Sequence, residues 1–131
     1  MSLLSPAATS LIKLMGETPR GPRREGVFAL WLTLRVAEDL LLTPPLADRA
    51  VKRRVTALEG RLSSLSLPAP LRRALVAALA GLADPRRDRA GQVLQLLVAP
   101  AREALGVEAS EILGRAARGA TQRAREEASP G

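Results

Sequence analysis

The sequence predicts an all-α protein, and three observations lead to that class. Hydrophobic residues make up 47% of the 131 residues but aromatic residues only 2%, so the core must consist mainly of leucine and alanine with some valine. Leucine and alanine favour helices, and the small number of β-branched residues argues against sheets. Apolar residues also recur at helical spacing. We therefore expect a single bundle or orthogonal array of five or six helices, a size that suits one domain.

The central element of this fold is an apolar helix expected at about residues 22–42. Its middle, Val27 to Leu34, reads Val-Phe-Ala-Leu-Trp-Leu-Thr-Leu and carries both aromatic residues, Phe28 and Trp31. A helix that is apolar on most of its circumference needs neighbours on several sides. We expect the other helices to pack around it.

A short helix precedes the central one, and a longer helix follows it. Ser5 and Pro6 are typical of a helix start, and this first amphipathic helix should end before Gly16. Glycine and proline then recur from residue 16 to residue 21, which indicates a loop or hinge. After the central helix, apolar residues step by four and three along a narrow seam: Val51, Val55, Leu58, Leu62 and Leu65.

Two more helices complete the expected core, which spans residues 22–106. The first begins at Pro70 and buries Leu71, Leu75, Ala78, Leu79 and Leu82. The second begins at Asp84-Pro85 and buries Ala90, Val93, Leu94, Leu97 and Ala101. Pro100 interrupts that pattern, so the helix is either kinked there or broken and restarted. Gly106 is a suitable C-terminal stop.

The remaining segment, residues 107–127, is expected to form a basic, alanine-rich helix from about Glu108. Beyond Ile112 and Leu113 its apolar positions are all alanine, so its face either binds weakly or packs very close to a partner. We expect its last two turns to fray and residues 128–131 to be disordered. The domain therefore covers residues 1–127, of which 1–21 are the short helix and hinge.

The apolar positions of these helices define the predicted core. Its members are Val27, Phe28, Leu30, Trp31, Leu34, Val51, Val55, Leu58, Leu62, Leu75, Leu79, Val93, Leu94 and Leu97.

Composition also bears on location. The chain has no cysteine, so disulfides and thiolate metal sites are excluded and nothing indicates secretion. The first residues lack the positive region of a signal peptide, and the longest apolar stretch is interrupted by Arg35, Glu38 and Asp39. We expect a cytoplasmic protein without a membrane span.

The residue types argue against an enzyme. Histidine, cysteine and tyrosine are all absent, which removes the commonest general bases, nucleophiles and metal ligands. A site made only of carboxylates would need Glu38, Asp39 and Asp48, but the simpler interpretation is that Arg35 and Arg49 neutralise these acids. We expect no cofactor, no metal and no small-molecule substrate, and an enzyme is the least favoured class.

The net charge of +7 and the isoelectric point near 11.5 favour acidic partners. Three helices are expected to begin with an arginine pair, although a cation in the first turn opposes the helix dipole. Arginine beside the free N–H groups of a helix start is suited to phosphate or carboxylate. The candidate anion- or partner-binding residues are Arg23, Arg24, Arg53, Arg54, Arg72, Arg73, Arg86 and Arg87.

Two functions of different kinds remain. The first is a non-catalytic helical interaction module, an adaptor, scaffold or self-assembling subunit, whose basic surface recognises an acidic or amphipathic protein partner. The alternative is a nucleic-acid-binding protein that contacts phosphates through the arginine pairs. A helix-turn-helix alignment of residues 72–97 is weak, because it puts Arg87 where an aliphatic side chain should be buried. We favour the interaction module, since the basic residues are scattered along the chain.

Overall fold

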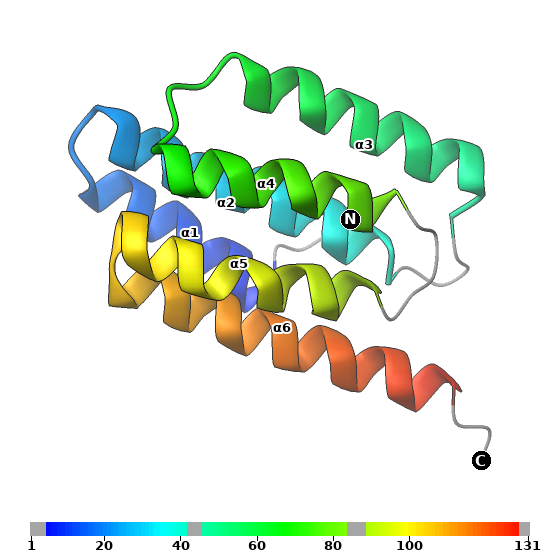
Figure 1. Ribbon diagram of the computed structural model, residues 1–131. Helices are drawn as coiled ribbons and strands as arrows, with labels where there is room; N and C mark the ends of the chain where they lie inside the picture. Colours follow the sequence, from blue (N-terminus) through cyan, green and yellow to red (C-terminus); the bar gives the residue numbers. More distant parts are fainter. Residues whose placement is uncertain (1–4, 42–45, 84–88, 129–131) are drawn as a thin grey trace.

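The computed structural model describes residues 5–41, 46–83 and 89–128, and these residues form six helices and no strand. The helices are α1 (Pro6–Glu17), α2 (Pro22–Asp39), α3 (Asp48–Ser63), α4 (Ala69–Leu82), α5 (Arg89–Leu105) and α6 (Val107–Ala128). Successive helices run in opposite directions, so the first turns of α2, α4 and α6 lie at the same end of the molecule as the last turns of α1, α3 and α5 (Figure 1). The predicted all-α class is confirmed.

The first two helices begin where the sequence predicts. The side chain of Ser5 accepts a hydrogen bond of 3.1 Å from the N–H of Ala8, and Pro6 follows it. Gly21 has a φ of +145°, a conformation that favours glycine, and Pro22 starts α2 directly after it. The predicted end of α1 before Gly16 is wrong by two residues, because α1 continues to Glu17. Helix ends are the least certain part of a pattern.

Helix α2 is central, since it packs against α1, α3, α4 and α5. Val27, Leu30 and Leu34 are buried as predicted. Phe28 and Trp31 depart from the prediction, because both are only partly buried at the edge of the core. Their rings stack with centroids 6.1 Å apart, and the guanidinium of Arg61 in α3 lies 5.5 Å from the centre of the Phe28 ring. The Phe28 ring therefore contributes a cation–π contact between α2 and α3.

The other predicted core positions are buried without exception. The α3 seam of Val51, Val55, Leu58 and Leu62 is one wall of the same core, as the apolar spacing indicates. The structure adds buried residues that the predicted core left out, from α1 and especially from α6. They are Ala8, Leu11, Ala109, Ile112, Leu113, Ala117, Ala120 and Ala124.

Helices α5 and α6 form a tight hairpin, the closest pairing in the fold. Gly106 alone joins them, with a φ of +103° that a residue with a side chain rarely adopts. Helix α5 runs through Pro100 as one helix, so the alternative of a break and restart is wrong. Its predicted start at Asp84-Pro85 lies outside the described residues.

The alanine-rich face of α6 packs close to α5 rather than binding weakly. A Cβ atom on Gly91 would lie 3.0 Å from the backbone N of Thr121 and 3.2 Å from the carbonyl oxygen of Ala117. The two backbones therefore touch at this point. Helix α6 continues to Ala128, which the prediction had assigned to a disordered tail, and residues 129–131 lie outside the described part of the chain. None of the described helices is long and apolar enough to cross a membrane.

The close contact at Gly91 gives a test of the fold. Alanine normally stabilises a helix by up to about 1 kcal/mol relative to glycine, but overpacking of a tight contact costs about 1–3 kcal/mol. We expect Gly91→Ala to lower the free energy of unfolding, measured by urea denaturation. Gly60→Ala in α3, where a new Cβ would meet nothing within 4 Å, should raise it. A stabilising Gly91→Ala would contradict the close approach of α5 and α6.

Candidate binding cavity

Two of the arginines at the helix starts, Arg23 and Arg72, donate hydrogen bonds to other parts of the protein. The Arg23 Nη2 atom, from the first turn of α2, donates a hydrogen bond of 2.9 Å to the carbonyl oxygen of Leu105 at the end of α5. The Arg72 Nη2 atom, near the start of α4, donates one of 2.9 Å to the carbonyl oxygen of Leu65, just after α3. Each guanidinium thus lies beside the negative end of a neighbouring antiparallel helix, which offsets the unfavourable position in its own helix.

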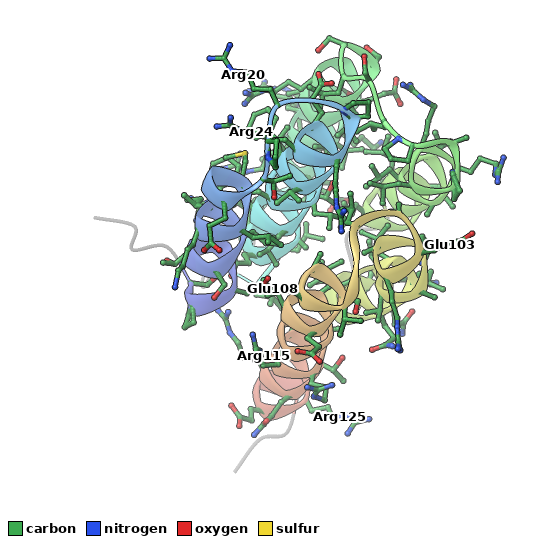
Figure 2. All side chains as sticks on the ribbon, turned by 90° about the vertical axis from the view of Figure 1, so that its left-hand side faces the viewer. Arg20, Arg24, Glu103, Glu108, Arg115 and Arg125 are labelled. Atoms are coloured by element: carbon green, nitrogen blue, oxygen red, sulfur yellow. The ribbon has the colours of Figure 1, made fainter. Side chains whose placement is uncertain are left out.

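The remaining candidate arginines have different surroundings. Arg54 pairs with Asp39, with 3.0 Å between its Nε atom and Oδ2. Arg53 and Arg73 are exposed, and Arg24 projects from the end of the molecule where α2 begins (Figure 2). Arg86 and Arg87 lie outside the described residues.

The described candidates do not converge on one face. Those of α2 and α4 lie at the end where these two helices begin, whereas α3, which carries Arg53 and Arg54 in its first half, starts at the opposite end (Figure 1). Helices α4 and α5 also run alongside each other in opposite directions, unlike the crossed pair of a helix-turn-helix.

A different feature of the surface has the form of a binding site. A cavity of about 400 Å³ lies between α1, α2, α5 and α6. Its volume falls in the range of small-ligand sites in proteins. Apolar side chains form most of its wall, and its lining residues are Ser5, Pro6, Ala7, Ser10, Leu34, Ala37, Glu38, Leu41, Leu94, Arg115, Ala116, Gly119, Ala120 and Arg123.

The last turn of α2 contributes an acid to this cavity. Glu38 lines it, and the Oε1 atom of Glu38 is buried with no hydrogen-bond partner in the part of the chain that the structure describes. The neighbouring carboxylate of Asp39 faces α3 and is paired with Arg54. Both acids are placed unfavourably, because the C-terminal end of a helix is already negative. Of the two, only Asp39 is compensated by a cation among the described residues.

Helix α6 contributes two cations to the same cavity. Arg115 and Arg123 are exposed, and neither makes a hydrogen bond or an ion pair with a described residue. Figure 2 shows Arg115 on the side of α6 that faces α1. Gly119 lies between the two arginines, and a Cβ there would meet nothing within 4 Å, so the cavity is open at this point.

This arrangement is suited to binding. The apolar wall can bury a hydrocarbon surface of a ligand. The two guanidinium groups can bind carboxylates through paired hydrogen bonds, and the free oxygen of Glu38 can accept a hydrogen bond. In the described part of the chain, no group of three or more acidic residues is placed to hold a metal ion.

Only part of this cavity is predictable from the sequence. The sequence predicts Glu38 as an acid neutralised by Arg35 or Arg49, and it does not indicate Arg115 or Arg123 as binding residues. No local pattern separates Arg115 and Arg123 from Arg118 and Arg125, which lie seven residues apart on the same helix.

Comparison with known proteins yields no match: no family model, no curated protein and no solved structure is similar to this chain. The assignment of a function therefore rests on the cavity and the surface charges.

The arginine contacts at the helix ends predict a difference between neighbouring residues. Arg23→Met should lower the free energy of unfolding by about 1 kcal/mol, because it leaves the Leu105 carbonyl oxygen without its charged donor. Arg24→Met is the matched control, since Arg24 makes no hydrogen bond or ion pair with a described residue and the charge change is the same. Equal costs in urea denaturation would show that the Arg23 hydrogen bond is not stabilising.

Proposed function

We propose that this protein is a non-catalytic helical interaction module that binds an acidic, amphipathic segment of a partner protein in the cavity between α1, α2, α5 and α6. The observation that carries the proposal is the pair Arg115 and Arg123, two guanidinium groups that lie beside an apolar wall and pair with no acid among the described residues.

The apolar wall is the first support. Leu34, Leu41 and Leu94 are each at most 2% exposed, so the floor of the cavity is continuous with the hydrophobic core. An apolar side chain placed there is removed from water and gains about 25 cal/mol per Å² of buried area. An amphipathic helix presents such side chains in a row, which is a recurring form of peptide recognition.

The charges of the cavity are the second support. Two arginines and one glutamate leave it with an excess of positive charge, in a chain whose net charge is +7. Arginine pairs favourably with carboxylates, and a long-range positive field increases the rate of association with an acidic partner. A segment with apolar side chains on one face and acidic side chains beside them matches both properties.

This function can be tested with a short designed peptide that carries leucine and alanine on one helical face and glutamate on the other. The fluorescence anisotropy of the fluorescein-labelled peptide should rise as the protein is added. The double variant Arg115→Gln, Arg123→Gln should weaken binding by about tenfold or more, because two charge-assisted contacts are lost.

The double variant Arg118→Gln, Arg125→Gln is the control for that experiment. It removes the same charge from the same helix, but these arginines line a separate hollow beside α5. It should change the affinity by less than about threefold at physiological salt, since distant exposed charges are screened. Equal losses in the two double variants, or no binding to the wild-type protein, would reject the proposal.

Nucleic-acid binding is a second candidate because of the outer face of α3. Arg49, Lys52 and Arg53 are all exposed there around a shallow hollow, and none of them is paired with an acid in the described residues. Three cations on one helix face are suited to successive phosphates.

A salt titration examines this second candidate. If α3 binds duplex DNA, anisotropy of a labelled duplex should show log affinity falling with log salt by about 0.9 per phosphate contact. The triple variant Arg49→Gln, Lys52→Gln, Arg53→Gln should make that slope shallower. The variant Arg102→Gln, Arg118→Gln, Arg125→Gln removes the same charge elsewhere and should leave the slope nearly unchanged. No binding of the wild-type protein at low salt would exclude this function.

A further inference from the structure

The charged side chains that oppose the helix dipoles differ in whether they have a hydrogen-bond partner. Arg23 and Arg72 each donate to a carbonyl at the end of another helix, and Asp39 accepts from Arg54. Glu38 differs from all three, because its Oε1 atom is buried and has no hydrogen-bond partner among the described residues. A buried charged oxygen without a donor is unfavourable, so its place in the wall of a cavity indicates a donor that arrives with a ligand.

We propose that Glu38 is the receptor for a cationic group, so that the partner segment carries a lysine side chain among its apolar and acidic ones. The lysine ammonium would donate to the free oxygen of Glu38, while carboxylates of the same segment reach Arg115 and Arg123. This inference deepens the proposed function by naming the chemistry of the segment, and it rests on that function for the partner being a protein.

The cavity meets the requirements of a lysine side chain. A lysine has an apolar stem of four carbons below a compact charge. Leu34 and Leu41 of the wall lie on either side of Glu38 in the chain and are buried, so a stem that reaches Glu38 passes along apolar surface. The excess positive charge of the two arginines would repel an isolated cation, which is the reason for requiring carboxylates in the same ligand.

Internal pairing is the competing interpretation, because a rotation of Arg115 or Arg123 could bring a guanidinium to Glu38. The two interpretations differ in the free protein. If an arginine pairs with Glu38, removal of the acid should destabilise the fold. If Glu38 is unpaired until a ligand binds, Glu38→Gln should leave the melting temperature equal or higher, since it removes an unpaired buried charge.

Small molecules test the inference without any peptide. The probes are 4-aminobutyrate, 6-aminohexanoate and 8-aminooctanoate, which join an ammonium to a carboxylate through apolar stems of different length, with 1-hexanol as the neutral reference. Binding is followed through the methyl NMR signals of Leu34, Leu41 and Leu94. At least one of the three amino carboxylates should bind. Glu38→Gln should weaken its affinity by about tenfold or more and leave the affinity for 1-hexanol unchanged.

Glu111→Gln is the matched control, because Glu111 is an exposed acid on α6 outside the cavity lining, and it should leave all affinities unchanged. The inference is overturned if no amino acid binds, if Glu38→Gln and wild type bind it equally, or if Glu38→Gln lowers the melting temperature while Glu111→Gln does not. Glu38-dependent binding of an amino acid, together with failure of the acidic peptide to bind, would retain this site and reject only the proposed protein partner.

Discussion

The alternating direction of the six helices determines where charge is tolerated in this protein. In an antiparallel arrangement, the positive start of one helix lies beside the negative end of its neighbour, and a long side chain can reach from one to the other. Arg23 and Arg72 use this geometry, so arginines that look misplaced in their own helices stabilise the ends of others. The same geometry makes an acid at the end of a helix acceptable where an arginine lies opposite, as Arg54 does for Asp39.

The antiparallel arrangement also changes the interpretation of the arginine pairs. In the sequence, a pair in the first turn of several helices indicates anion binding, because only the helix that carries it can be considered. In the fold, one arginine of each described pair donates to a backbone carbonyl, whereas Arg24 and Arg73 make no hydrogen bond or ion pair with a described residue. Among the described residues, cations without an acidic partner also occur on α3 and α6.

How well each feature could be predicted from the sequence depends on whether it rests on residues that are neighbours in the chain or on residues far apart in it. Helical spacing and local starts such as Ser5-Pro6 and Gly21-Pro22 depend on neighbours in the chain, so the helices and most of the core could be predicted. The partial exposure of Phe28 and Trp31 depends on how far α3 covers α2, which no local pattern contains. The cavity combines Glu38 with residues far along the chain, and its arginines have no local feature that separates them from other exposed arginines.

The small residues of α6 explain why a cavity exists there at all. On the side of α5, Ala117 allows the backbones to meet at Gly91, which holds α6 firmly against the core. On the side of α1, Ala116, Gly119 and Ala120 are equally small and line the cavity, while α1 packs more extensively on α2 than on α6. One helix surface therefore gives close packing on one side and an unfilled space on the other. Larger residues at these positions would close the cavity and cover Glu38, so the alanine-rich composition of α6 is a condition for both the hairpin and the site.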